Sequence, residues 1–367
     1  MDANAIWKVS TGKGVKVAVI DSGISDSTPS LKGQVLVGEV PQKVAYGATK
    51  DYVGHGTTMA ELIAGTGAGG GLKGLAPGAK IIPFRVQVSE MKDKAEQKKT
   101  AEPAEAIRAA ADTDAKIINM SFGQDLIDPD TEAAVKYAQS KGKLLFAAVG
   151  NDAEKKNSIG YPAAYDNVVG VAASDETGKV GKFSEHGSFV DLAAPGLHLP
   201  EWCDATLASY CSDAKGTSSA SALASASAAL IWSAHPDWTN NQVLRVLTDT
   251  ASRSWPKDTP SNYLGYGLIR PARNLLHNEG QPGTANVDPI TNQQTTETGS
   301  GSDTPSSTSA SGSSQPSQKA SDVPAEAAGS EAKSSSDSNT LWIALGAIAA
   351  VIVVGGVGFA VMRARRS

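Results

Sequence analysis

Cysteine is scarce in this chain, and no run of basic residues stands out. Only two cysteines occur among 367 residues, and two thiols without other ligands close by do not make a structural zinc site. The formal net charge of −5 is mild, and with no basic stripe it argues against nucleic acid as a partner. No acidic loop has the spacing of a calcium site, so the sequence specifies no metal and leaves structural calcium open.

The first part of the chain has the composition of a globular domain. Residues 1–279 are enough to bury a substantial core as one domain. Apolar stretches alternate with helical patterns along this part, at residues 15–20, 80–85, 116–120, 144–149 and 168–171. This alternation predicts a three-layer α/β fold around a mostly parallel central sheet.

A change in composition at Gly280 marks the end of the predicted domain. Residues 280–339 are rich in Ser, Thr, Gly and Pro and are expected to form a disordered linker. Residues 340–362 are predicted to form a transmembrane helix, because their uncharged stretch covers roughly 33 Å against a hydrocarbon core of about 30 Å. The basic tail, residues 363–367, is expected in the cytoplasm, which places the domain outside.

Export of the domain requires a signal, and the beginning of the chain does not look like one. Met1-Asp2-Ala3-Asn4 contains neither a basic segment nor an apolar one. We therefore interpret the sequence as a trimmed mature form. If Met1 is the native start, a cytosolic protein anchored by its tail is the alternative, and protease accessibility at the cell surface separates the two.

Three short motifs carry the side chains that nucleophilic catalysis needs. Asp21 ends an apolar stretch just before a turn, His55 opens a helical pattern, and Ser218 precedes a run of small residues. A serine becomes a strong nucleophile when a histidine takes its proton and a carboxylate orients that histidine. The motifs therefore supply an acid, a base and a nucleophile in this order.

The motifs resemble those of the subtilisin-like serine proteases, or subtilases, over about Ile6 to about Leu276. The resemblance is carried by ordered segments: Asp21-Ser22-Gly23, His55-Gly56-Thr57, Asn119 to Gly123, Ala147 to Asn151, Tyr161 to Tyr165, Val190 to Gly196, Gly216-Thr217-Ser218, Pro236 to Thr239 and Gly265 to Gly267. It implies an endopeptidase without a cofactor that works through an Asp-His-Ser triad and an acyl-enzyme. Asp191, in one of these segments, is expected to hydrogen-bond locally rather than react.

Two positions depart from the family's nucleophile motif, which usually reads Gly-Thr-Ser-Met-Ala with Pro one residue further on. Ser219 stands in place of the Met and Ala222 in place of the Pro. Neither position moves a proton in the reaction, and alanine is a strong helix former. We expect altered packing with retained chemistry; an inactive descendant is the alternative.

The resemblance also implies residues that bind the substrate. The family places its oxyanion-hole asparagine where Asn151 stands, with the backbone N–H of Ser218 as the second donor. Ser121-Phe122-Gly123 resembles the segment that pairs with an extended substrate. Phe122 either walls a specificity pocket or is a core aromatic at the end of a strand.

The two cysteines lie close together in a predicted loop before Ser218. Cys203 and Cys211 have a spacing that an exported protein would use for a disulfide. A disulfide at this place also resembles the mycosins, membrane-anchored subtilases of type VII secretion systems. That resemblance implies an extracytoplasmic protease with protein or peptide substrates and a secretion complex as partner. A scaffold on a subtilase fold with little or no proteolytic role is the competing hypothesis.

Overall fold

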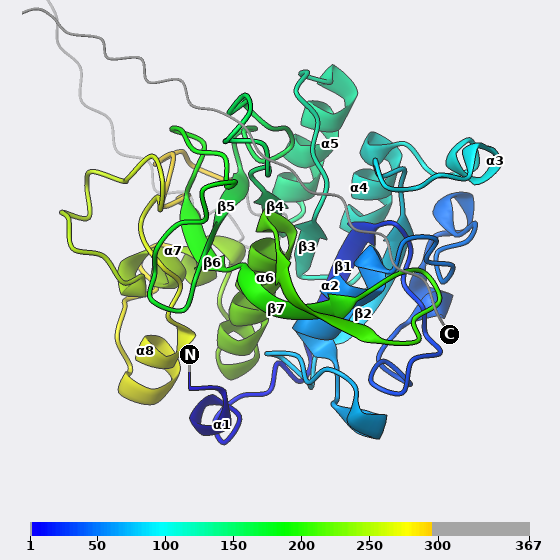
Figure 1. Cartoon of the computed structure of the whole chain (residues 1–367). Helices are drawn as coiled ribbons and strands as arrows, with labels where there is room; N and C mark the ends of the chain where they lie inside the picture. The colour runs from blue at the N-terminus through cyan, green and yellow to red at the C-terminus, as the bar shows by residue number, and fades with distance from the viewer. Residues whose placement is uncertain (1, 296–367) are drawn as a thin grey trace, which may run out of the picture. The chain divides into compact units, whose positions relative to one another are not determined.

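A parallel sheet forms the centre of the fold in the computed structural model, which describes residues 2–295 (Figure 1). Its six strands follow the order β2-β1-β3-β4-β5-β6. Their bounds are β1 Lys16–Asp21, β2 Lys80–Arg85, β3 Ile117–Met120, β4 Leu144–Ala148, β5 Val168–Ser174 and β6 Leu192–Pro195. Every neighbouring pair runs parallel, and the strands other than β6 coincide with the apolar stretches of the sequence.

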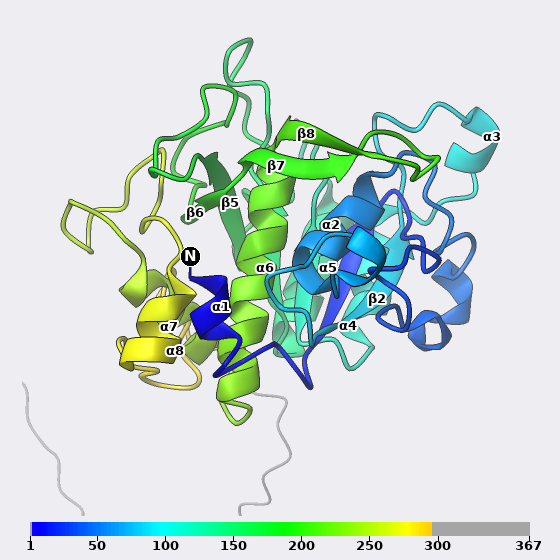
Figure 2. The ribbon, with the colours of Figure 1, turned by 60° about the horizontal axis from the view of Figure 1, so that its bottom comes forward.

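Helices cover both faces of this sheet, which confirms the predicted three layers (Figure 2). One face packs against α1 Ala3–Ile6, α2 His55–Ala64, α6 Thr217–Ala234, α7 Asn240–Thr250 and α8 Pro271–His277. The other face packs against α4 Pro103–Ala111 and α5 Pro129–Ser140. Successive β1 residues alternate between the layers, with Val17 and Val19 on one side and Ala18 and Ile20 on the other. Short helical turns lie in connecting loops: η1 Val37–Glu39, η2 Gln42–Val44, η3 Ala68–Gly70 and α3 Lys94–Gln97.

The long helix α6 is buried almost all round and consists largely of alanine and serine. Its small side chains let it lie directly against the sheet beside α2. The hydroxyls of Ser221 and Ser225 donate to Asn119 Oδ1 at 3.0 and 3.1 Å, and Asn119 belongs to β3. These bonds satisfy the polar groups inside the core and fix α6 against the carboxyl end of β3.

An antiparallel hairpin, β7 Leu197–Trp202 and β8 Tyr210–Lys215, leads into the start of α6. The sequence predicted a loop here, and the structure shows paired strands instead. A disulfide between Cys203 and Cys211 confirms the expected bridge, with Cα atoms 5.0 Å apart. Tyr210 fastens the hairpin to α2, because its hydroxyl donates to Glu61 Oε2 at 2.7 Å and its ring stacks on Trp202.

Residues 280–295, which the sequence assigned to the linker, pack against the domain. Asp288 is buried, and its Oδ1 accepts the N–H groups of Ile290 and Thr291 at 2.8 and 2.9 Å. Arg245 of α7 donates to the Val287 carbonyl at 3.0 Å. Polar contacts of this kind leave no apolar pattern in the sequence, so composition placed the boundary too early. The rest of the predicted linker, and the predicted span and basic tail, lie outside the described residues.

No helix within residues 2–295 combines the length and the apolar character needed to cross a bilayer. Residues 340–362 lie outside this part of the chain, so the predicted span stays a prediction.

Loss of the disulfide is expected to destabilise the domain. In the chain-entropy account, a bridge that closes so short a loop contributes about 2 to 3 kcal/mol. We expect dithiothreitol, or the double substitution Cys203→Ser and Cys211→Ser, to lower the melting temperature of the full chain. Thermal melts with and without reductant measure this, with alkylation to count free thiols. Equal melting temperatures for the bridged and fully reduced protein would contradict it.

Candidate active site

The carboxyl end of β1 carries a buried carboxylate that is bonded to a histidine. Asp21 has no exposed surface, and its Oδ1 accepts a hydrogen bond from His55 Nδ1 at 2.7 Å. The same oxygen accepts the backbone N–H of Ser22 at 2.7 Å. His55 is the first residue of α2, and a quarter of its side chain is exposed. The two residues predicted as acid and base are thus in direct contact.

A glycine allows this contact between α2 and β1. A Cβ atom on Gly56 would lie only 2.2 Å from the carbonyl oxygen of Gly23 and 3.0 Å from Asp21 Cβ. A larger residue would push the first turn of α2 away from the end of β1. The close approach explains why glycine follows the histidine.

Asp51 holds the start of α2 in place, although no sequence motif pointed to it. Its Oδ1 accepts Ser22 Oγ at 2.9 Å and Gly54 N at 2.8 Å, while its Oδ2 accepts Thr57 N at 2.8 Å and Thr57 Oγ1 at 2.7 Å. These bonds satisfy orphan N–H groups at the helix start and tie it to the loop after β1. An aspartate just before a predicted helix was the available signal.

The surroundings of His55 favour its protonated form. Burial lowers the pKa of His55, but the charge of Asp21 and the hydrogen bond to it, with additions from Asp51 and Glu90, raise that pKa to about 9. The imidazole is therefore protonated at neutral pH and becomes a free base under alkaline conditions.

Ser218 is the half-buried second residue of α6, at the end of the helix where backbone N–H groups are unpaired. Its Oγ donates to the Ser121 carbonyl at 3.4 Å, and within residues 2–295 no hydrogen bond joins it to His55. Such bonds are often loose without substrate and tighten when it binds. The neighbouring serines are less suitable, because Ser219 is buried and the hydroxyl of Ser221 is used by Asn119.

Asn151 follows β4, and its amide is oriented by the residue before Ser218. Its Oδ1 accepts both the N–H and the hydroxyl of Thr217, at 2.9 and 3.0 Å, which directs Nδ2 elsewhere. A methyl group on Gly216 would lie 3.8 Å from Ser218 N and 4.0 Å from Asn151 Nδ2. The two nitrogens thus flank one small space, as the donors of an oxyanion hole must. Thr217 was missed as an orienting residue, although it lies inside the serine motif.

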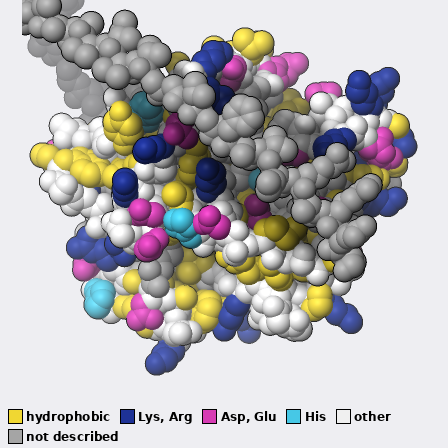
Figure 3. Space-filling view, in the orientation of Figure 1, with side chains coloured by type: hydrophobic (Ala, Val, Ile, Leu, Met, Phe, Trp, Pro, Cys, Tyr) yellow, Lys and Arg dark blue, Asp and Glu magenta, His cyan; other side chains and the backbone are white. Residues whose placement is uncertain are grey.

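These groups line one cleft of about 650 Å³, which His55, Asn151 and Ser218 share with the segment Ser121-Phe122-Gly123. Phe122 lines the cleft and also packs against the core layer of α4 and α5, and its role in a specificity pocket stays a prediction. Gln124 and Tyr161 exchange backbone hydrogen bonds of 2.9 Å and hold the end of the segment. On the face seen in Figure 3, acidic and basic side chains are interspersed rather than gathered by sign.

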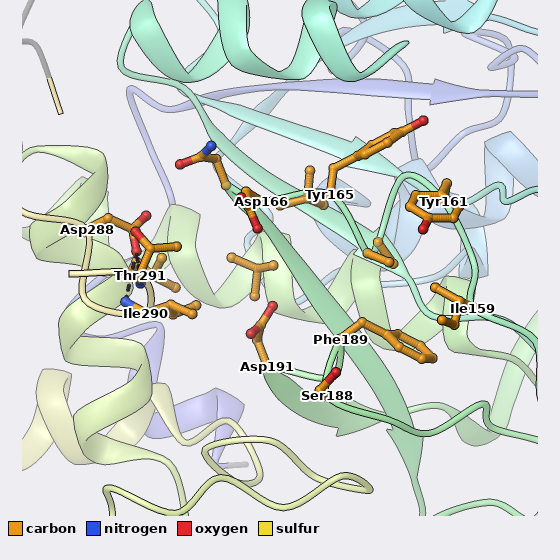
Figure 4. A pocket seen from close by; sticks show the side chains of 16 residues that line it. Ile159, Tyr161, Tyr165, Asp166, Ser188, Phe189, Asp191, Asp288, Ile290 and Thr291 are labelled. Carbon is orange, nitrogen blue, oxygen red and sulfur yellow. Dashed lines mark hydrogen bonds between the residues drawn. The ribbon is translucent and has the colours of Figure 1, made fainter. Parts of the chain in front are cut away.

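A second cavity, of about 320 Å³, contains none of the predicted catalytic residues (Figure 4). Tyr161, Phe189 and Ile290 line it together with Asp191 and Asp288. The side chain of Asp191 accepts the N–H of Gly170 at 2.8 Å, so it bonds locally as the sequence predicted. Burial raises the pKa of Asp191 to about 7, with the hydrogen bond from Gly170 opposing the rise and the charge of Asp288 adding to it.

A carboxylate-imidazole pair, a serine at a helix start and two convergent donors define a serine hydrolase site. The chain matches the Subtilase family over residues 12–267 and belongs to that family. It is 33% identical to Subtilisin BL from Lederbergia lenta over 260 residues, which are 71% of this chain and 90% of that protein. The protein is thus a subtilisin-like serine protease.

Solved structures of mycosins are also similar to this chain. The MycP3 protease from the type VII (ESX-3) secretion system is 28% identical with a TM-score of 0.61, covering 75% of this chain and 86% of its own. MycP1 from Mycobacterium smegmatis is 26% identical with a TM-score of 0.62, covering 77% and 84%.

Proteolysis is expected to rise with pH until His55 loses its proton. An imidazolium cannot accept the proton of a serine, so kcat/KM should fall as the pH drops below about 9. Asp21→Asn removes the negative charge that contributes most to raising the pKa of His55. The acid limb of the pH profile should therefore move to lower pH, while kcat/KM falls. A pH profile of peptide hydrolysis for both proteins measures the shift. Identical acid limbs would show that a different group titrates.

Proposed function

We propose that this protein is an endopeptidase that uses Ser218, His55, Asp21 and Asn151. The observation that carries the proposal is that His55, bonded to the buried Asp21, lines one open cleft together with the partly exposed serine and Asn151. A blocked cleft would have favoured a scaffold without activity.

The proposed reaction follows from these positions. Ser218 Oγ attacks the scissile carbonyl carbon, and His55 takes the proton of Oγ and passes it to the leaving amine. Asp21 keeps the imidazole in the right tautomer and stabilises its charged form. The oxyanion receives hydrogen bonds from Asn151 Nδ2 and Ser218 N. Water, activated by the same histidine, then hydrolyses the acyl-enzyme.

The shape of the cleft supports cleavage within a polypeptide rather than at its end. The cleft is lined by residues 87–90 and Ser121-Phe122-Gly123, and also by Glu201 and Trp202 of the β7–β8 hairpin. An extended chain bound at Ser218 thus has binding surface beyond the scissile bond. Backbone pairing gives affinity with little dependence on sequence.

We also propose that the protease is a mycosin-like member that faces the outside of a membrane and acts with a type VII secretion complex. Support comes from the structural similarity to MycP3 and MycP1, the disulfide before Ser218 and the predicted span. Protease treatment of intact cells tests this topology: digestion of the catalytic domain with protection of a tag on the basic tail is expected. Protection of both ends would favour the cytosolic alternative.

Ser218→Ala is expected to abolish both peptide hydrolysis and covalent labelling by a fluorophosphonate. The hydroxyl supplies the attacking oxygen and contributes little to packing, so the melting temperature should hardly change. Ser219→Ala is the matched control and should still be labelled at Ser218. Labelling and mass-spectrometric mapping measure both; a wild-type protein that is not labelled would support the scaffold.

Asn151→Ala is expected to lower kcat more than it changes KM. The amide contacts the developing oxyanion more strongly than the ground-state carbonyl, so its loss affects the chemical step. The expected loss is about 10²- to 10³-fold, which is the size known for the oxyanion-hole asparagine of subtilisin, a member of this same family. Steady-state kinetics on a peptide with rate-limiting acylation measures it. An unchanged kcat would place the donor elsewhere.

A further inference from the structure

We infer that the protease prefers lysine or arginine at the substrate residue that supplies the scissile carbonyl, and that Glu185 selects this residue. The inference rests on the proposed function and names a substrate class for the same cleft. Glu185 lies on the loop before β6, and only 4% of the residue is exposed, yet it lines the cleft that contains Ser218.

The carboxylate of Glu185 lies next to the proposed oxyanion hole. A Cβ atom on Gly150 would fall 2.0 Å from Glu185 Oε2, and one on Gly160 would fall 3.5 Å from it. Gly150 directly precedes Asn151, and both glycines line the cleft. When the carbonyl oxygen of a substrate residue binds to Asn151 Nδ2, the side chain of that residue therefore lies beside the two glycines. Because glycine has no side chain, the carboxylate of Glu185 stays within reach of the substrate side chain.

Glu185 differs from Asp125 and Asp152, the acidic groups that raise its pKa, because no cation neutralises it. Asp152 pairs with Lys155 at 2.9 Å and Asp125 pairs with Lys156 at 3.1 Å, all four on the exposed rim. Within residues 2–295 no lysine, arginine or histidine nitrogen lies within 4.0 Å of the Glu185 carboxylate. A buried carboxylate without a cation is costly, and an incoming ammonium or guanidinium group removes that cost.

The charges around Glu185 agree with this assignment. Burial, and then the negative charges of Asp125 and Asp152, raise the pKa of Glu185, while backbone hydrogen bonds from Ser158 and Asp152 partly offset the rise. The cleft is acidic as a whole, since Glu90 and Glu201 also line it, against Lys215 and His55. A basic side chain therefore enters a field that attracts it.

The loop that carries Glu185 is held rigidly, as a specificity residue requires. Glu185 N donates to the Gly150 carbonyl at 3.1 Å. The next residue, His186, donates its N–H to Asn157 Oδ1 at 2.9 Å, and Asn157 Nδ2 donates back to the His186 carbonyl at 3.0 Å. The carboxylate is thus preorganised, so little entropy is lost when a cation binds.

The test compares peptides that differ only in the residue before the scissile bond: lysine, arginine, or norleucine, which matches lysine in length without its charge. For the full chain we expect kcat/KM for lysine to exceed that for norleucine by about 10-fold or more, the size of a charge-assisted hydrogen bond. Glu185→Gln should reduce this ratio to near one. Glu185→Asp, which keeps the charge, should retain part of it.

Asp125→Asn is the matched control, because it removes a rim carboxylate that already has a lysine partner; it should change the ratio by less than about 3-fold. An equal loss for lysine and norleucine in Glu185→Gln would show a structural role and overturn the inference. A wild-type preference for norleucine would overturn it too, while leaving the proposed function intact. Failure to hydrolyse any peptide, together with no fluorophosphonate labelling, would instead refute the proposed function.

Discussion

The burial of α6 between the sheet and its neighbouring helices is the constraint on which the site depends. Most side chains along this helix are small, and the buried serine hydroxyls among them must find partners inside the core. Asn119 supplies one such partner, since its Oδ1 accepts from Ser221 and Ser225 while its Nδ2 donates to Ser121 Oγ at 3.0 Å. One buried amide thus links β3, the substrate segment and the helix that presents Ser218.

Electrostatics then determine how the site works. Asp21 is completely buried, and its Oδ2 has no hydrogen-bond partner among the described residues. Its negative charge is balanced mainly through Oδ1, and the imidazole of His55 is the group that gains most from it. The buried carboxylate therefore acts on the site mainly by holding the base in position.

The cleft combines a rigid floor with walls taken from distant parts of the chain. Thr217 clamps Asn151, and also accepts Gly150 N at 3.2 Å, so the oxyanion donors are fixed to the start of α6. The β7–β8 hairpin rests on α2, where Trp202 N donates to Thr58 Oγ1 at 3.0 Å. Because the disulfide closes this hairpin, the wall beyond Ser218 is held covalently as well as by packing.

Local patterns in the sequence were sufficient for part of this structure. Buried strands appear in the sequence as short apolar stretches, and these stretches located β1 to β5. The motifs predicted Asp21, His55, Asn151 and Ser218 as site residues. With only two cysteines in the chain, the disulfide had a single intramolecular pairing. The hairpin was missed because a loop and a short exposed strand pair have similar compositions.

Tertiary structure alone decided which residues act on these groups from a distance. The role of Asp51 is seen only in its bonds to Ser22 and Thr57, and that of Glu185 only in its position next to Gly150. Neither contact leaves a pattern within a short window of sequence. Burial separated Ser218 from the serines beside it. The sequence determined which chemistry was available, and packing across long separations decided where each group lies, because such contacts depend on the whole core rather than on neighbouring residues.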